Sequence, residues 1–416
     1  MTLTVKDKVF LMLIRRALFD KNEQLSSLGI KAEDVDWKSV SDEALIHAMS
    51  MVAIDGTVDL DGVEIPTNVL DDWQGRSIQF ILKNEALMSA QDKLIEILES
   101  ENIHGAVIKG ASSAFCYKTP ESRTLGDVDF LVLEKDYSRA IETLEKNGFT
   151  KAEDEGNPCH TELFYNGCLI EIHRYINGLP DGELGEYIKG IFARSLSEER
   201  HYQTVGGYTF PVTNDLCQAL TLLLHTQGHI QKGGLGLRHL CDWATFVDKK
   251  LTDELKEELL PVLEHIGLVK FYNVLTEICE KFLFSEEFAL DQSLESSDAL
   301  CDMLMLDFIF CGNFGRKEPE ALRGSAVFTR KTVVETKKGS VSKVKIFRNL
   351  SWFLKCSWAP CQKHPILLPI GFVYVPIRYL WRVIRGKRKL VGVKFISQTA
   401  KRNSLYEQLE LFEHKE

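Results

Sequence analysis

Three carboxylates stand where they can act together. Asp127 and Asp129 flank a valine at the start of an apolar run, and Glu171 lies between two isoleucines in a second run. Because side chains alternate along a strand, Asp127 and Asp129 must point to the same face. Two carboxylates this close raise each other's pKa unless a cation lies between them. If the two runs are neighbouring strands, the three acids converge. Their hard oxygen donors then suit Mg²⁺ or Mn²⁺, ions that can polarise a phosphoryl group.

A segment of small residues precedes these acids. Lys109 and Gly110 end a short apolar run, and Ser112 follows after one alanine. Backbone N–H groups around Gly110 and Ser112 can approach a phosphate closely, with the start of a helix behind them. Lys109 and Arg123 supply positive charge that could hold a triphosphate. Arg123 has a second interpretation, in which it anchors its loop to a carboxylate.

Other polar groups favour structural roles. His173, two residues after the third acid, is interpreted as a hydrogen-bonding support for the site. His225 and His229 have the i, i+4 spacing of zinc ligands, but no second pair at a matching spacing joins them, which favours ordinary helix histidines. Arg238 and Asp242 have the same spacing and predict an ion pair on a helix, with contacts into a neighbouring cleft as the alternative.

The elements that must position these residues follow from hydrophobic periodicity. Helices are expected over 86–100, 136–147, 215–230 and 237–249, and strands over 106–108, 128–133, 162–165 and 168–172. Asn166-Gly167 between the last two strands predicts a β-hairpin. The order strand, helix, strand, helix, hairpin predicts an α+β fold, with a small mixed β-sheet core, flanking helices and a helical companion domain.

Four segments are predicted along the chain. A helical N-terminal extension covers 1–103, the α/β core covers 104–213, a helical domain covers 214–320, and a basic, aromatic-rich C-terminal segment covers 321–416. The glycine-rich stretch 232–236 is interpreted as a flexible connection, with a lid over the site as the alternative.

The spacing of these motifs resembles a known superfamily. Lys109-Gly110 at the end of a strand, Asp127 and Asp129 on the next and Glu171 on a further one look most like the uncharacterised bacterial branch of the polymerase-β-like nucleotidyltransferases. The resemblance implies that Asp127 and Asp129 hold catalytic Mg²⁺ and that Glu171 completes the site as a ligand or as a base. It also implies that Gly110 and Ser112 contact the phosphates, while Lys109 or Arg123 balances their charge.

Composition sets the class of protein. The chain has 416 residues, 44% of them apolar and 26% charged, which is ordinary for a globular protein and excludes whole-chain disorder. Ten scattered cysteines favour a reducing cytoplasm. The first residues lack the order of a signal peptide, and no apolar run reaches the roughly 18 residues of a membrane span. A cytoplasmic protein is therefore expected.

The net charge of −10 is unevenly distributed. Residues 321–402 hold 19 Lys and Arg against one acid, whereas residues 1–320 hold 30 against 55. Within 352–389 an apolar stretch lies between aromatic and basic residues. Three interpretations of this stretch are ranked. The first is that it packs onto the acidic body, the second that it binds the anionic inner face of the membrane, and the third that it binds RNA. Cys356, Cys361 and His364 offer only half a zinc site, so no zinc is predicted.

The expected function is transfer of a nucleoside monophosphate from ATP or another NTP to an unknown acceptor, with Mg²⁺ as cofactor. The alternative is a catalytically inactive module that keeps the same fold to bind a nucleotide or a partner. The three acids at 127, 129 and 171 favour the enzyme, because a binding module has no need of mutually repelling carboxylates.

Overall fold

The computed structural model describes most of the first 312 residues. The described parts are 3–152, 159–180, 182–198, 200–232, 235–284 and 296–312, then 351, 354, 358, 360–361, 364–385, 405 and 408–411. The predicted flexible stretch 232–236 lies partly outside them, as do Cys356 and most of the basic segment 321–416.

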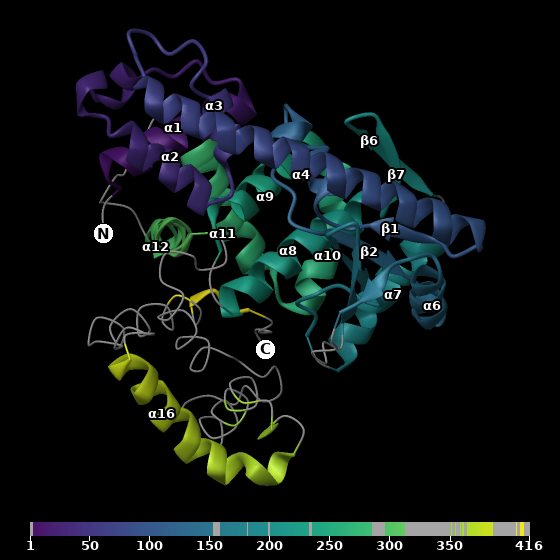
Figure 1. The fold of residues 1–416 in the computed structure, drawn as a ribbon. Coiled ribbons are helices and arrows are strands. Elements are labelled where there is room, and N and C mark those ends of the chain that lie inside the picture. Colours follow the sequence, from purple (N-terminus) through teal and green to yellow (C-terminus); the bar gives the residue numbers. More distant parts are fainter. Residues whose placement is uncertain are drawn as a thin grey trace.

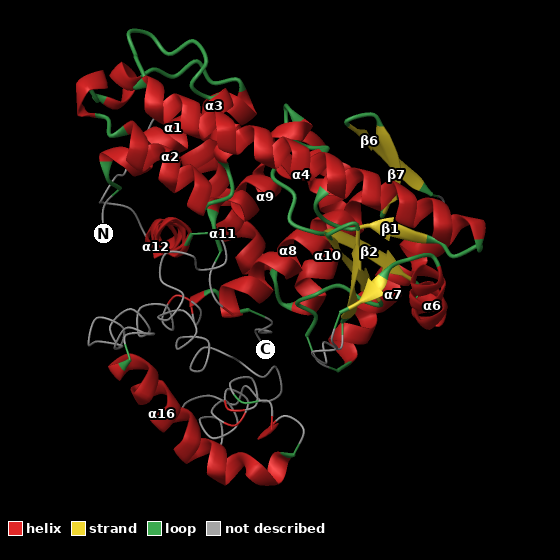
Figure 2. Ribbon diagram, viewed as in Figure 1, coloured by secondary structure: helices red, strands yellow, loops and turns green. Residues whose placement is uncertain are grey.

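A seven-stranded mixed sheet forms the core of one half of the molecule, drawn as yellow arrows in Figure 2. Its strands are β1 (Gly105–Val107), β2 (Val128–Val132), β3 (Thr150–Lys151), β4 (His160–Tyr165), β5 (Cys168–His173), β6 (His201–Val205) and β7 (Tyr208–Val212). Their order is β3-β4-β5-β2-β1-β7-β6. β2 runs parallel to β5, and β1 runs parallel to β7 but antiparallel to β2. The predicted mixed sheet is confirmed.

Local turn chemistry explains two hairpins of this sheet. β4 and β5 pair antiparallel around Asn166 and Gly167, whose φ angles are 48° and 78°. Positive φ at both central residues is what a tight two-residue hairpin turn requires, so the Asn-Gly prediction is confirmed. The β6–β7 hairpin turns at Gly206-Gly207 in the same way, and the sequence analysis had overlooked both of its strands.

Two helices cover one face of the sheet. α4 (Thr67–Ser100) and α6 (Tyr137–Lys146) both contact β5, and α4 crosses the sheet in Figure 1. Val128, Phe130 and Val132 of β2 join the buried cluster beneath these helices. Because strand residues alternate, Asp129 must point to the opposite face. The predicted helix over 86–100 is thus the second half of a much longer one.

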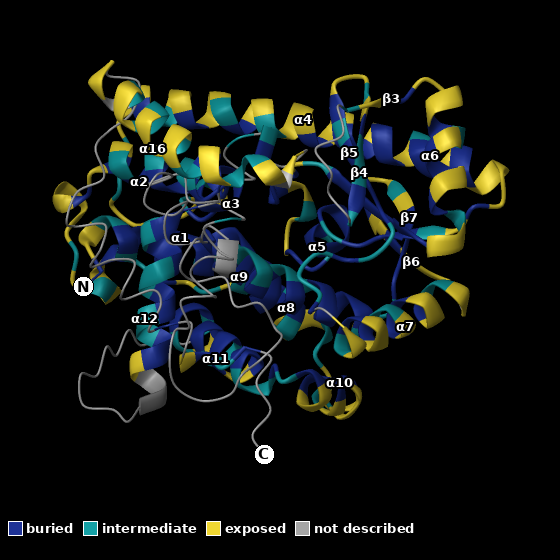
Figure 3. Ribbon diagram, turned by 90° about the horizontal axis from the view of Figure 1, so that it is seen from below, coloured by how far each residue is buried: buried dark blue, intermediate teal, exposed yellow. Residues whose placement is uncertain are grey.

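The short helix α5 (Ala111–Ala114) buries Ala111 and Ala114 in the cluster of the sheet. The other helices build a second core beside the sheet. They are α1 (Val5–Phe19), α2 (Trp37–Ile46), α3 (Ser50–Asp55), α7 (Glu183–Ser197), α8 (Asp215–Lys232), α9 (Leu237–Lys250), α10 (Asp253–Ile266), α11 (Val269–Cys279), a π-helical turn (Glu280–Phe284) and α12 (Ser296–Cys311). Side chains from both ends of this order share one buried cluster, and α8 and α9 are dark blue over much of their length in Figure 3. The N-terminal helices therefore pack with the helical domain that follows the sheet.

The described C-terminal part consists mainly of α16 (Leu368–Ile384), after the 3₁₀ turn Pro365–Leu367. Ile366, Ile377 and Ile384 are 86%, 60% and 83% exposed. These three side chains are not covered, but packing of the apolar stretch onto the acidic body stays a prediction. Among the helices described, none is both long and apolar enough to cross a bilayer.

Candidate functional site

Strands β2 and β5 bring the three predicted carboxylates together. Asp127 directly precedes β2, and Asp129 is paired in register with Glu171 on the parallel neighbour β5. Oxygen atoms of the three side chains lie within 4.8 Å of one another. The convergence expected from alternation and strand adjacency is therefore present, on the sheet face that α4 and α6 leave uncovered.

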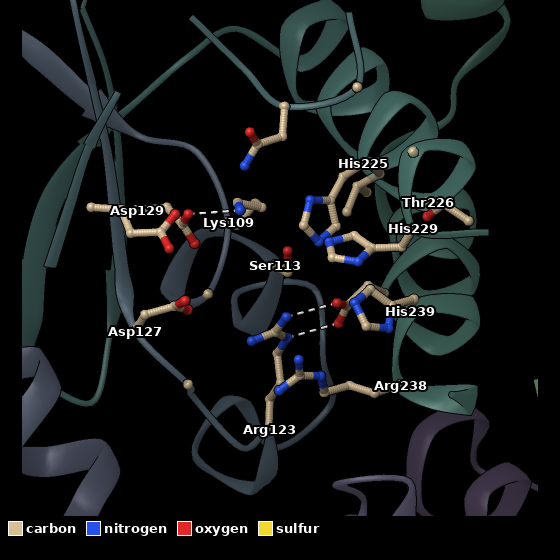
Figure 4. Close-up of a pocket in the computed structure, with 18 of the residues that line it drawn as sticks. Lys109, Ser113, Arg123, Asp127, Asp129, His225, Thr226, His229, Arg238 and His239 are labelled. Carbon is tan, nitrogen blue, oxygen red and sulfur yellow. Dashed lines mark hydrogen bonds and ion pairs between the residues drawn. The ribbon is translucent and has the colours of Figure 1, made fainter. Parts of the chain in front are cut away.

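The environments of the two aspartates push their pKa values apart. Burial, reinforced by the charge of Asp129, raises the pKa of Asp127 to about 6. Burial would raise the pKa of Asp129 too, but Lys109 and His173 outweigh it and hold that pKa well below its usual range. The Lys109 ammonium lies 2.6 Å from Asp129 Oδ1, as Figure 4 shows. The ionised form of Asp127 is therefore repelled by Asp129, and a cation bound between the two carboxylates would relieve this repulsion.

Two histidines support the acids from β4 and β5. His173 is fully buried, and its Nε2–H donates to Asp129 Oδ1 over 2.9 Å and lies 3.2 Å from Glu171 Oε2. Burial lowers the pKa of His173, but the hydrogen bonds to these carboxylates outweigh burial and raise it. His160 Nδ1 lies 3.3 Å from Glu171 Oε2. The supporting role predicted for His173 matches this geometry.

The loop after β1 contributes Lys109, Gly110 and Ser113 to a cavity above the acids. Gly110 adopts φ 60° and ψ −106°, a conformation that only glycine enters without strain, and α5 begins at the next residue. Ser112, the predicted phosphate contact, is 3% exposed and is not among the described residues that line the cavity, whereas Ser113 is. The small-residue signal was therefore informative about the loop but not about which serine faces the cavity.

Arg123 anchors the loop before β2 to helix α9. Its Nε and Nη2 donate to the two carboxylate oxygens of Asp242, each over 2.7 Å, the two dashed lines that leave Arg123 in Figure 4. The Tyr117 hydroxyl donates to the same carboxylate over 2.8 Å. Burial would lower the pKa of Arg123, but Asp242 raises it above its ordinary value. Of the two interpretations of Arg123, this ion pair matches the one in which Arg123 anchors its loop to a carboxylate. Arg238, whose expected partner was Asp242, donates from Nη1 to the Thr124 carbonyl over 3.1 Å.

Helices α8 and α9 supply the opposite wall of the cavity. His225, His229 and His239 lie together there, with ring centroids 4.3 to 5.9 Å apart, and face the acids across the cavity in Figure 4. Burial and neighbouring positive charges lower the pKa values of His225 and His239 well below 6.5, so both rings are neutral at pH 7. His225 Nδ1 is buried with no hydrogen-bond partner among the described residues.

The histidine wall was the part of the site that sequence reasoning missed. The sequence favours ordinary helix histidines at His225 and His229 and gives no signal for His239. Their i, i+4 spacing was the one available signal, and it pointed to zinc. Among the described residues, the groups whose atoms are close enough to hold a metal are the acidic triad and His160 with Glu171 and His173.

The cavity between the two walls measures about 310 Å³, at the lower end of the range for small-molecule sites. The acids at its floor fit Mg²⁺ or Mn²⁺, because three carboxylates offer hard oxygen atoms within 4.8 Å of one another and burial with the charge of Asp129 raises the pKa of Asp127. The arrangement can bind an ion that faces an anionic ligand.

A family model and a solved structure are similar to this chain. Residues 33–284 match a family model described as an uncharacterised nucleotidyltransferase. No curated protein was found to match the chain. Among solved structures, an antigenic nucleotidyltransferase-like protein from Paracoccidioides brasiliensis aligns over 46% of this chain and 92% of its own, at 14% identity and a TM-score of 0.28. That structural likeness is too weak to support an inference.

Proposed function

The chain belongs to this family of uncharacterised nucleotidyltransferases, and from that premise we propose that it transfers a nucleoside monophosphate from an NTP to an acceptor hydroxyl or phosphate. Family membership indicates a transferase. The observation that carries the specific proposal is the convergence of Asp127, Asp129 and Glu171 at the floor of a cavity. The identity of the acceptor is left open by these residues.

Asp127, Asp129 and Glu171 would hold Mg²⁺ or Mn²⁺. When bound, the ion would neutralise charge on the triphosphate and polarise the phosphoryl group under attack. Asp129 is kept ionised by Lys109 and His173, so it is ready to act as a ligand across the physiological pH range. Glu171, 13% exposed, acts in the proposal either as a third ligand or as the base for the acceptor.

The loop after β1 would bind the phosphates. Gly110 allows the backbone to approach closely, Ser113 offers a hydroxyl, and Lys109 and Arg238 bring positive charge to the same cavity. Lys109 has a second task, because it balances Asp129 over 2.6 Å. Positioning and charge neutralisation are the main requirements of in-line nucleotidyl transfer, and these residues address both.

The histidine wall would contact the second substrate or the nucleoside. Neutral imidazoles donate and accept hydrogen bonds without attracting the triphosphate as cations would. His225 lines the cavity, and its ring faces the acids across it. A hydroxyl-bearing group between the two walls would form a hydrogen bond with this wall.

The decisive experiment is a label-transfer assay. Purified protein, Mg²⁺ and each α-³²P-labelled NTP in turn are incubated with fractionated lysate of the source organism, and labelled products are separated. The proposal expects transfer by the wild type, no transfer by Asp127→Asn/Asp129→Asn, and full transfer by Glu145→Gln, an exposed acid on α6. A γ-labelled NTP should label no acceptor.

The outcomes separate the proposal from its alternative. Transfer that survives in Asp127→Asn/Asp129→Asn would refute the assigned site. The inactive binding module is favoured if no labelled nucleoside monophosphate is transferred from any NTP, while the wild-type protein still binds NTP with Mn²⁺ and Asp127→Asn/Asp129→Asn does not. Binding is measured by calorimetry or by Mn²⁺ relaxation, so this answer does not depend on finding the acceptor.

A further inference from the structure

Helix α16 carries a continuous apolar stripe on its exposed side. Ile370, Val373, Ile377, Leu380 and Ile384 are exposed by 55%, 61%, 60%, 51% and 83%. At 100° per residue these positions fall within an arc of about 80° on the helix surface. Scattered exposed aliphatic residues are ordinary, but a stripe of five along one helix needs a partner.

The opposite side of the helix is the one that packs. Gly371 is buried, and a Cβ there would lie 2.7 Å from Cys361 Sγ, with Trp358 and Leu354 close by. Cys361 also donates from its thiol to the Leu367 carbonyl over 3.5 Å. These contacts fix which side of α16 is turned inward, and they leave the stripe facing outward.

Cations and aromatic rings border the stripe. Arg385 lies over the Trp381 ring at 4.0 Å from its centroid, and Arg378 lies 6.0 Å from that of Tyr374. Trp381 and Tyr374 are 48% and 41% exposed. Residues 321–402, which contain this helix, hold 19 basic residues and one acid. An apolar face flanked by amphipathic rings and arginines is the pattern of a helix that lies in a membrane interface.

We propose that α16 docks the protein onto the surface of an anionic phospholipid bilayer, with the stripe of Ile370, Val373, Ile377 and Leu380 in the acyl boundary and the arginines at the phosphates. The lipid surface is favoured over RNA because a nucleic acid would leave the aliphatic stripe in water. It is favoured over a second copy of α16 because antiparallel pairing about a two-fold axis would bring strongly basic segments together.

Vesicle flotation of the full chain tests this proposal. Vesicles of phosphatidylcholine alone are compared with vesicles in which a quarter of the lipid is phosphatidylglycerol. The wild type should float with the anionic vesicles only. Ile377→Asp/Leu380→Asp should weaken binding by about tenfold or more, because two charges replace apolar groups at the acyl boundary. Arg378→Gln/Arg385→Gln should weaken binding by about tenfold as well and flatten its salt dependence.

A matched control lies on α4. Ile81 and Leu82 are 50% and 65% exposed, so Ile81→Asp/Leu82→Asp makes the same chemical change on another surface and should float like the wild type. Absence of wild-type flotation, equal loss in this control or unchanged flotation of Ile377→Asp/Leu380→Asp would each overturn the proposal. The proposal would also be overturned if the wild type bound polyuridine but no vesicle. It would be overturned as well if the wild type bound no vesicle and formed a dimer that Ile377→Asp/Leu380→Asp converts to a monomer. None of these results depends on nucleotidyl transfer.

Discussion

Replacing Asp242 by asparagine should lower the free energy of unfolding by about 3–5 kcal/mol, because removing one partner of a buried ion pair leaves the other charge uncompensated. Arg123 and Asp242 are 6% and 5% exposed, and two hydrogen bonds of 2.7 Å join them. An asparagine offers one acceptor oxygen where the guanidinium needs two, and its amide nitrogen meets donors from Arg123 or Tyr117.

Urea unfolding, followed by tryptophan fluorescence and circular dichroism, measures this loss. Trp243 is fully buried next to Asp242 and reports on α9, while circular dichroism reports on all helices. The control is Asp253→Asn, which breaks an ion pair with Lys256 of similar length, 2.9 Å, in which Asp253 is 92% exposed. Because solvent screens that pair, the control should unfold like the wild type.

Equal losses of stability in Asp242→Asn and Asp253→Asn would refute the reasoning, since burial and the hydrogen bonds that burial isolates from water are what separate the two pairs. A further variant isolates the charge. In Arg123→Met/Asp242→Leu both charges are gone and the space is filled by apolar groups, so most of the stability should return. If this double variant is as unstable as Asp242→Asn, lost packing rather than a stranded charge explains the effect.

Three further predictions concern the cavity. The pKa of Asp127 is about 6 in the folded protein and 3.8 as a free group, so its ionisation destabilises the fold as the pH rises from about 4 to 6. Asp127→Asn should therefore stabilise the metal-free protein by about 1–3 kcal/mol at pH 7 and have no effect below pH 4. Thermal unfolding in EDTA measures this difference. Gly110→Ala should cost about 1–3 kcal/mol because of its φ of 60°, whereas Gly126→Ala, whose added Cβ meets nothing within 4 Å, should leave the unfolding midpoint unchanged. His225→Ala should leave Mn²⁺ affinity unchanged but slow label transfer by about fivefold, the value of one hydrogen bond; a loss of Mn²⁺ binding would contradict its placement on the opposite wall.

The acidic half of the site was predictable because each step rests on local rules. Alternation put Asp127 and Asp129 on one face, and the Asn166-Gly167 turn defined the hairpin that contains Glu171. The pairing of β2 with β5 was the condition that the sequence left open, and the register Asp129–Glu171 meets it. Periodicity likewise located α6, α8 and α9 to within two residues at most of their ends.

The helical wall was not predictable in the same way. His239 lies ten residues beyond His229, after a helix break, and reaches the other rings only through the packing of α8 on α9. Arg123 and Asp242 are 119 residues apart, and no periodicity in either segment indicates that they meet. α7 and the β6–β7 hairpin were overlooked although Gly206-Gly207 between two alternating runs was a usable turn signal.

The two walls of the cavity belong to separate hydrophobic cores. The strand that carries Asp129 is packed mainly within the core beneath α4 and α6, while α8 and α9 are packed within the helical core. The Arg123–Asp242 pair bridges the two. Side chains on α8 and α9 can therefore change without moving the carboxylates, so long as Asp242 keeps its partner. This division is the physical reason why, under the proposed function, we expect differences in the acceptor to involve residues of the helical wall and not the acidic strands.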